Sequence, residues 1–182
     1  MISNVDSSLF AVPTANRDES TFEITDKVYD RAQVLEFNKR AKGTKLDEVK
    51  KIYLPYEVLE NLFKKAAADF EFDAESHALL AEIEQILQAN FKISYGNRIL
   101  DQINTFVPVY VAAGQGSGLS DEQLIVEALD YQLTYKVLRK LEYVEMNRDA
   151  NKDAGDKLRK KFEQNGMKLA KEFMDWKLRG EE

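Results

Sequence analysis

Three polar residues of this chain have side chains that can act on a phosphate group: Asn16, Arg31 and Arg98. Asn16 follows an apolar run from Leu9 to Val12, and an amide just beyond a buried strand can orient an attacking water molecule. Arg31 closes a short helix-like segment, from which a guanidinium can bond a phosphate. Arg98 stands near a helix start, where a cation opposes the helix dipole, so another interaction should hold it there.

Each of these residues also fits an ordinary structural role, and the sequence leaves both interpretations open. An asparagine in the place of Asn16 is a frequent turn cap. Arg31 follows Asp26 and Asp30 on the same short segment, and with either of them it can form a surface ion pair. Arg98 can be an ordinary solvated arginine.

A strand–helix–strand unit is predicted to position the first two of these residues. The apolar run before Asn16 and a second run from Val34 to Phe37 have the character of buried strands, and the segment that ends at Arg31 lies between them. Two strands alone are marginal in water, since a stable sheet needs roughly three or more. The pattern therefore indicates that a larger sheet or a partner completes this unit.

The segment that carries Asn16 and Arg31 is LFAVPTANRDESTFEITDKVYDRAQVLEF, residues 9–37, and it resembles the region from sensor 1 to the arginine finger of AAA+ ATPases. It is most similar to the McrB family, the nucleotide-hydrolysing subunit of modified-cytosine restriction systems. The resemblance implies that Asn16 positions the attacking water and that Arg31 reaches the transferred phosphate across a subunit interface. Arg17 is a second candidate for a contact with the nucleotide from a neighbouring subunit.

A weaker resemblance continues to residue 142, over the helical lid that follows an AAA+ core. The segment SYGNRIL, residues 94–100, is similar to the start of the family's sensor 2 helix, and EALDYQLTYKVLRKLE, residues 127–142, is similar to its last lid helix. This implies that Arg98 swings over the nucleotide as sensor 2. In the family the aromatic residue and the arginine usually adjoin, whereas here two residues separate Tyr95 from Arg98.

Two parts of a nucleotide site are missing from the sequence. It has no G-x-x-x-x-G-K-[ST] loop to cradle phosphates, and no apolar strand that ends in Asp-Glu to hold magnesium. The resemblance therefore implies the C-terminal piece of an AAA+ module whose parent hydrolyses ATP or GTP with Mg²⁺, whereas this chain alone is expected to bind and hydrolyse neither. The implied partners are the missing N-terminal part of the core, further copies in a hexameric ring, DNA and a nuclease subunit.

The expected fold is mostly α, with a small βαβ remnant of an AAA+ α/β core at its N-terminus. Residues 1–37 form the end of that core, 38–54 a basic linker, 55–142 a four-helix lid, and 143–182 a loop and a C-terminal amphipathic helix. Apolar residues at helical spacing predict the lid helices. These helices cover about residues 55–70, 73–89 and 95–113, and a fourth extends from Ser120 to about Leu141.

Short sequence signals mark the expected helix ends. Pro55 is placed in the first turn of the first lid helix, where its missing N–H costs nothing. Ser120, with a glutamine at the third position after it, has the spacing of a capping box. The polar segment NRDANKDAGDK, residues 147–157, is typical of a loop, and Asn165-Gly166 is expected to break the last helix or divide it into a pair.

Composition narrows the class of protein. The chain has 182 residues, of which 44% are apolar and 32% charged, and this suits a helical domain with a substantial core. Its net charge of −6 argues against a nucleic-acid binder that uses its whole surface. It has no cysteine and no apolar run near the roughly 18 residues of a membrane span, so a cytoplasmic protein without membrane contact is expected.

Two other functions are also compatible with the sequence. A non-enzymatic helical interaction module would bind another protein at the open sheet edge. A nucleic-acid-binding helical domain would use basic residues near the C-terminus, which alternate with acidic ones as on a solvated helix face. These basic residues are Lys157, Arg159, Lys160, Lys161, Lys168 and Lys171.

Two further polar residues receive structural interpretations. The single histidine, His77, lacks a second histidine or cysteine for a metal site. Asp130 is expected to cap a lid contact.

Overall fold

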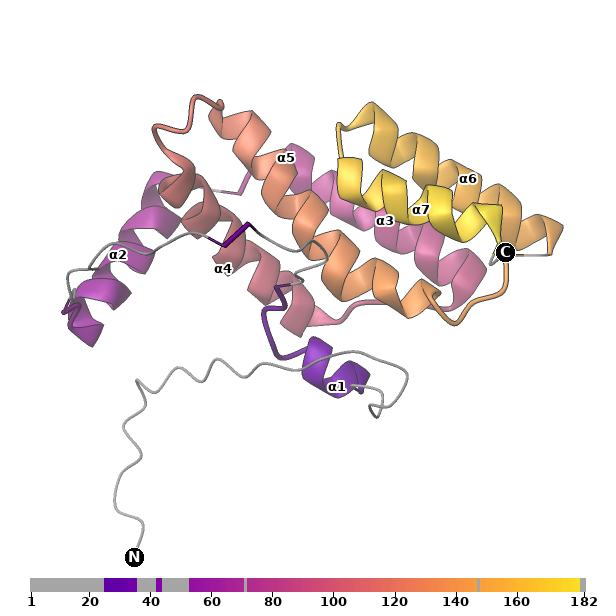
Figure 1. Ribbon diagram of the computed structural model, residues 1–182, viewed down its shortest axis with the longest axis horizontal. Coiled ribbons are helices and arrows are strands. Elements are labelled where there is room, and N and C mark those ends of the chain that lie inside the picture. The colour runs from indigo at the N-terminus through magenta and orange to yellow at the C-terminus, as the bar shows by residue number, and fades with distance from the viewer. Residues whose placement is uncertain (1–24, 36–41, 44–52, 71, 147, 181–182) are drawn as a thin grey trace, which may run out of the picture. The chain divides into compact units, whose positions relative to one another are not determined.

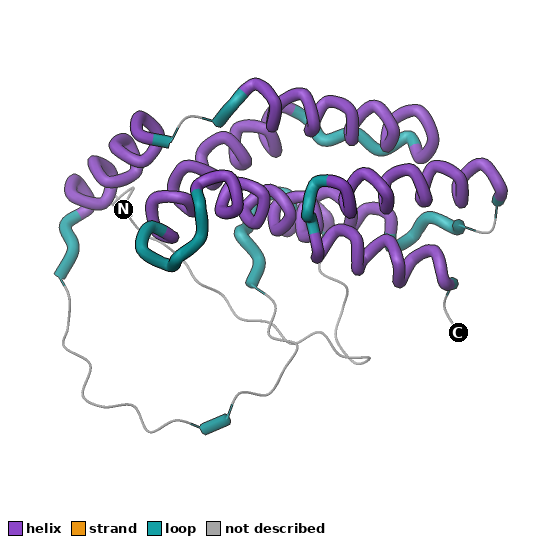
Figure 2. Tube along the Cα trace, turned by 90° about the horizontal axis from the view of Figure 1, so that it is seen from above, coloured by secondary structure: helices purple, strands orange, loops and turns teal. Residues whose placement is uncertain are grey.

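The computed structural model of the chain is mostly helical over the residues that it describes, which confirms the predicted mostly α class (Figures 1 and 2). Among these residues no strand occurs. The described residues are 25–35, 42–43, 53–70, 72–146 and 148–180. The helices, in chain order, are α1 (Asp26–Tyr29), α2 (Tyr56–Asp69), α3 (Ala74–Phe91), α4 (Asn97–Gly114), α5 (Asp121–Gln132), η1 (Leu133–Val137), η2 (Leu138–Leu141), α6 (Asp149–Gln164) and α7 (Lys168–Arg179).

The chain divides into two compact units, residues 1–62 and 63–182, and each is described by itself. The first unit contains α1, which coincides with the short helical segment predicted before Arg31. Residues 34 and 35, part of the predicted second strand, belong to no helix or strand. Residues 9–24 and 36–37 of the predicted βαβ unit lie outside the described part of the chain.

Helices α3 and α4 owe their place in the second unit to apolar residues repeated once per turn. The carboxylate of Asp73 caps α3 by accepting the backbone N–H of Ser76 at 2.6 Å. Burial of each large aliphatic side chain stabilises the fold by about 1.5–3 kcal/mol. The buried residues of this kind are Leu80, Ile83 and Leu87 on α3, and Ile99, Ile103, Val107 and Val111 on α4.

The predicted capping box at the start of α5 is confirmed. The Ser120 hydroxyl accepts the backbone N–H of Gln123 at 3.3 Å, and the Gln123 side chain accepts the backbone N–H of Ser120 at 2.9 Å. The helix then continues into η1, a π-helical turn, and η2, a 3₁₀ turn. The fourth predicted helix is thus present, but its last nine residues, Leu133 to Leu141, are not a regular α-helix.

The prediction of a loop over residues 147–157 is wrong from Asp149 onward, where α6 begins. Three small or apolar side chains on α6, Ala154, Leu158 and Phe162, are spaced one turn apart and are buried. Packing of this narrow stripe outweighs the polar composition of the segment, because most helix stability in proteins comes from tertiary burial.

The C-terminal region is a helical hairpin, which agrees with the predicted division of the last helix into a pair (Figure 1). Gly166, between α6 and α7, has a φ of 70°, a left-handed conformation that only glycine adopts without strain. Within the second unit α6 packs on α7 and on α3, α4 packs on α5, and α5 packs on α7. One continuous apolar core therefore connects α3, α4, α5, α6 and α7, together with η1 and η2.

Helix α2 contains the boundary between the two units and begins one residue later than predicted. Pro55 precedes it, and the Pro55 carbonyl accepts the backbone N–H groups of Val58 and Leu59 at 3.1 and 3.2 Å. Ala66 is the buried residue of this helix. Within the described part of the chain, no helix combines the length and apolarity needed to cross a bilayer.

Candidate functional site

The predicted site residues fall into three groups. Asn16 and Arg17 lie outside the described residues. Arg31 belongs to the first unit and Arg98 to the second, so each is described within its own unit.

Arg31 lies in the turn that ends α1. Its backbone N–H donates to the Val28 carbonyl at 3.1 Å, and the next N–H, of Ala32, donates to the same carbonyl at 2.8 Å. The Arg31 side chain is exposed, and its guanidinium forms no ion pair with Asp30 or with any other described side chain. The surface pairing with Asp30 that the sequence allowed is thus absent, and the guanidinium points to no intramolecular partner among the described residues.

Arg98 is the second residue of α4 and is also exposed. The helix has no acidic residue in its first turn, and its N-cap, Gly96, offers no side chain to accept a hydrogen bond. A cation at this end opposes the helix dipole by about 0.3–1 kcal/mol. No described side chain forms an ion pair with Arg98, so nothing in this part of the structure compensates that cost.

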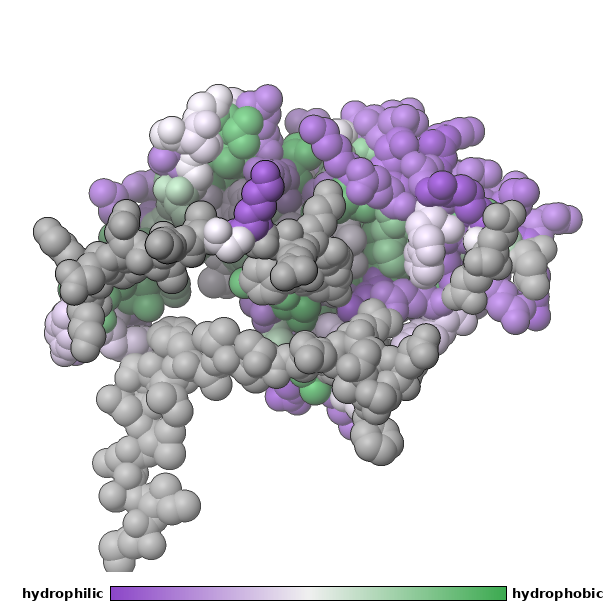
Figure 3. All heavy atoms as spheres, in the orientation of Figure 1, coloured by the Kyte–Doolittle hydropathy of each residue, from purple (hydrophilic) through white to green (hydrophobic). Residues whose placement is uncertain are grey.

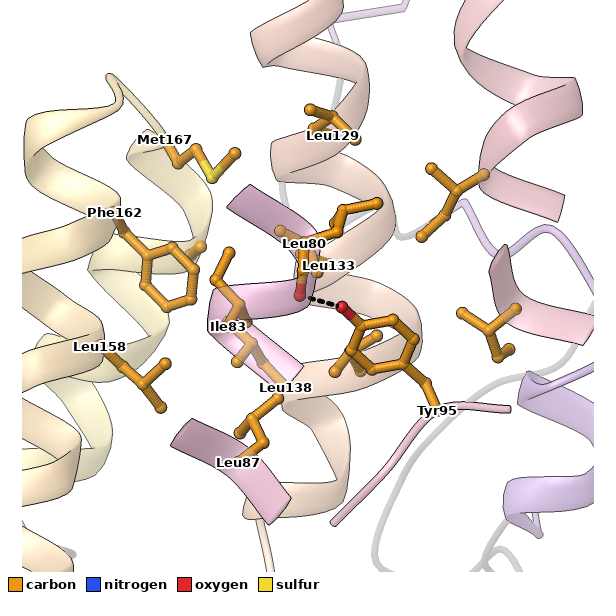
Figure 4. Close-up of a cluster of buried hydrophobic side chains, with 14 of the residues drawn as sticks. Leu80, Ile83, Leu87, Tyr95, Leu129, Leu133, Leu138, Leu158, Phe162 and Met167 are labelled. Carbon is orange, nitrogen blue, oxygen red and sulfur yellow. Dashed lines mark hydrogen bonds between the residues drawn. The ribbon is translucent and has the colours of Figure 1, made fainter. Parts of the chain in front are cut away.

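Tyr95, just before α4, is a buried neighbour of Arg98 that is hydrogen-bonded to α3. Its ring is buried, and its hydroxyl donates to the Leu80 carbonyl of α3 at 2.5 Å, as Figure 4 shows. Its backbone N–H donates to Glu84 Oε1, also on α3, at 3.3 Å. Burial, reinforced by the Glu84 carboxylate, raises the pKa of the Tyr95 hydroxyl far above its ordinary value, so it stays protonated as a donor.

Asp130 caps a contact, as expected, but the contact is with the C-terminal hairpin. Its buried carboxylate accepts the backbone N–H groups of Leu169 and Ala170 at 2.8 and 2.7 Å, in the first turn of α7. Burial raises the pKa of Asp130, and the backbone N–H groups oppose that shift by stabilising the carboxylate. This acid is a structural cap and faces no candidate site residue.

His77 is an exposed residue of α3 whose ring packs edge-on against Phe72, with 4.3 Å between the ring centroids. Among the described residues no three His, Cys, Asp or Glu side chains are close enough to hold a metal ion.

Sequence reasoning missed Lys136, a buried lysine in the π-helical turn η1. Its ammonium donates to Gln102 Oε1 of α4 at 2.6 Å. Single π-helical turns occur frequently at functional sites. The signal that could have drawn attention to it is a lysine inside the run LTYKVL, where its neighbours Leu133, Val137 and Leu138 are all buried.

Three of the six basic residues named for the C-terminal hairpin, Arg159, Lys161 and Lys171, form ion pairs with acidic side chains. Arg159 lies 3.6 Å from Asp175 and 3.7 Å from Glu163, and Lys171 lies 2.8 Å from Asp175. The hydrogen bond from Lys171 lowers the pKa of Asp175, which therefore remains charged. Figure 3 shows hydrophilic side chains over α6 and α7, but these pairs reduce the positive charge that nucleic acid would need.

A shallow groove of about 590 Å³ lies beside the end of α7. Trp176, Tyr143 and Lys152 are among its lining residues, and Lys177 on its wall donates to the Glu142 carbonyl at 2.6 Å. Arg98 does not line it. Its mixed acidic and basic lining gives no single charge with which to select a phosphate.

A family model described as a domain of unknown function (DUF8727) matches residues 46–172 of the chain. No curated protein and no solved structure matches it.

Proposed function

The chain belongs to the DUF8727 family, a domain of unknown function, and we propose that it forms the C-terminal part of an AAA+ nucleoside triphosphatase. In this proposal residues 1–37 end the α/β core and residues 55–142 form the lid. The parent is a ring, most simply a hexamer, that works on DNA as a restriction or defence motor together with a nuclease subunit. The missing N-terminal part of the core supplies the phosphate loop.

The observation that carries the proposal is the exposed Arg31 in the turn after α1, inside a segment that resembles an arginine finger. A finger must leave its own subunit, so its guanidinium should lack intramolecular partners, and Arg31 has none among the described side chains. Arg98, exposed in the first turn of α4, has the same property on the proposed lid.

The chemistry assigned to these residues is electrostatic. Arg31 stabilises the charge that grows on the transferred phosphoryl group of ATP or GTP, and Asn16 orients the attacking water. Arg98 closes over the nucleotide from the lid. In this proposal the acid pair of the missing part of the core would hold Mg²⁺ beside the phosphate loop.

The test uses the complete protein that joins this chain to a phosphate loop. Arg31→Ala should reduce turnover by about 10³- to 10⁵-fold and leave nucleotide binding nearly intact, because a finger acts on charge that develops only in the transition state. Arg148→Ala, which removes an exposed arginine at the start of α6, is the matched control. Equal turnover of the Arg31 variant and this control would refute the finger.

Mixed rings give a sharper result. Arg31→Ala subunits are combined with Asn16→Ala subunits, each inactive alone. If Arg31 acts across an interface, some interfaces of a mixed ring combine the unsubstituted Arg31 of one subunit with the unsubstituted Asn16 of the next. Part of the turnover should then return. Rings shown by mass spectrometry to be mixed, yet without recovered turnover, would count against the proposal.

A second candidate function is a helical interaction module, and the exposed side of α2 favours it. Within the first unit, Val58 and Leu62 are 43% and 52% exposed, although both are apolar. If partner binding is the function, Leu62→Glu should abolish association with that partner, whereas Arg31→Ala should leave it unchanged. Pull-down with the whole chain, read by mass spectrometry, compares the two variants.

A further inference from the structure

Building on the proposed function, we propose that Tyr95 is a positioning residue for Arg98. Its buried hydroxyl fixes the start of α4 against α3, and this fixes the point from which the Arg98 guanidinium reaches the phosphates of the nucleotide. Tyr95 itself makes no contact with the nucleotide.

The first support is that Tyr95 is bonded twice to one helix. Its hydroxyl donates to the Leu80 carbonyl at 2.5 Å, and its backbone N–H donates to Glu84 Oε1 at 3.3 Å. The two acceptors are one turn apart on α3, so the residue is held at both its backbone and its side-chain end. Figure 4 shows the Tyr95 ring within the apolar cluster, with its hydroxyl bonded to Leu80.

The second support is that no side chain caps the start of α4. The connection from α3 begins with Lys92, which has a left-handed φ of 59°, and ends at Gly96, which forms no side-chain cap. The first backbone bond of α4 runs from the Ile99 N–H to the Gly96 carbonyl at 2.9 Å. Ile99 packs into the core, but an apolar contact has no direction, whereas the hydroxyl bond of Tyr95 sets one.

This arrangement explains the spacing between Tyr95 and Arg98 in the sequence. Two residues separate the aromatic ring from the arginine, so the ring stays in the core while the arginine emerges on the first turn of the helix. Tyr95 then anchors the start of α4 from within the core, and the exposed Arg98 is free to meet a phosphate.

The first experiment needs only the present chain. Hydrogen exchange is followed in the wild type, in Tyr95→Phe and in a control, Tyr110→Phe, which changes a half-buried tyrosine later on the same helix. In Tyr95→Phe the amides of residues 99–101 should exchange about 5- to 10-fold faster, the effect of one hydrogen bond, while those of α6 keep their rate. Unchanged exchange at 99–101, or equal acceleration in α6, would overturn local positioning.

The second experiment uses the complete triphosphatase. Arg98→Ala should lower kcat/KM about tenfold or more, and Tyr95→Phe should reproduce part of that loss. In the double variant the loss should equal that of Arg98→Ala alone, because the hydroxyl acts only through the arginine. Losses that multiply would overturn the inference while the proposed function stands. If Arg98→Ala changes nothing, the sensor 2 assignment fails first, and the inference fails with it.

Discussion

The carboxylate of Asp130 on α5 accepts the backbone N–H of Ala170 on α7 at 2.7 Å, which joins residues 40 positions apart in the sequence. The same carboxylate accepts the Leu169 N–H at 2.8 Å. Asp130→Ala leaves both N–H groups without this acceptor, so we expect the free energy of unfolding to fall by about 2 kcal/mol. Urea unfolding followed by circular dichroism measures it, and a loss below about 0.5 kcal/mol would contradict the capping role.

The pH dependence of Asp130 gives a second prediction. Burial raises its folded pKa above the ordinary value of 3.8, so its contribution is full below that pH and declines as the pH rises through the folded pKa. Asp130→Asn does not titrate. The unfolding free energy of the wild type minus that of Asp130→Asn should therefore fall as the pH rises from about 3.8. A difference that grows over this range would mean that the N–H bonds outweigh burial.

Gly166, in the turn between α6 and α7, should be sensitive to substitution. Its φ is 70°, and an added Cβ would meet only Val126 Cγ1 at 3.8 Å, so any cost comes from the backbone and not from a clash. Gly166→Ala should destabilise the protein by about 1–2 kcal/mol, and Gly166→Asn by less. Gly96→Ser, at a φ of −74°, is the matched control and should change little. Thermal unfolding compares the three variants.

Arg98→Glu should make the protein more stable. The substitution replaces a cation that opposes the dipole of α4 with an anion that favours it, and we expect a gain of about 0.3–1 kcal/mol at low ionic strength. Arg98→Gln should give an intermediate value, and both gains should shrink in salt. A loss of stability in both variants would reveal a favourable interaction of Arg98 that the described residues do not contain.

The chain alone should not hydrolyse ATP or GTP with Mg²⁺, because it lacks both the phosphate loop and the acid pair. Phosphate release from the purified chain is the measurement. Activity that disappears in Asn16→Ala or Arg31→Ala would show that the chain carries a complete site, and it would refute the idea of a C-terminal part.

Local signals predicted local structure well. The capping box of Ser120 and the break at Gly166 depend on residues within one turn, and both are present. The polar segment before Leu158 was wrongly assigned to a loop, because α6 has a narrow apolar stripe whose partners lie elsewhere in the chain. Composition in a window cannot reveal such a stripe, since only the folded neighbours make it favourable.

The sequence proposes which residues form the candidate site, but it could not predict their surroundings. The exposure of Arg31 and Arg98 follows from their places at helix ends, which the sequence indicated. The anchoring of Tyr95 by Leu80 did not follow, because the two residues are 15 positions apart and meet only when α3 and α4 fold together. Asp130 was expected to cap a contact, yet its acceptor role depends on backbone groups about 40 positions away.

The π-helical turn η1 also bears on how this chain tolerates changes in length. A π-turn holds one residue more than an α-turn, so the chain on its far side is rotated relative to an uninterrupted helix. Removing one residue between Leu133 and Val137 would restore an ordinary helix there, whereas the same deletion within α5 would turn its buried face outward. Relatives that differ by one residue in this helix should carry the gap at η1.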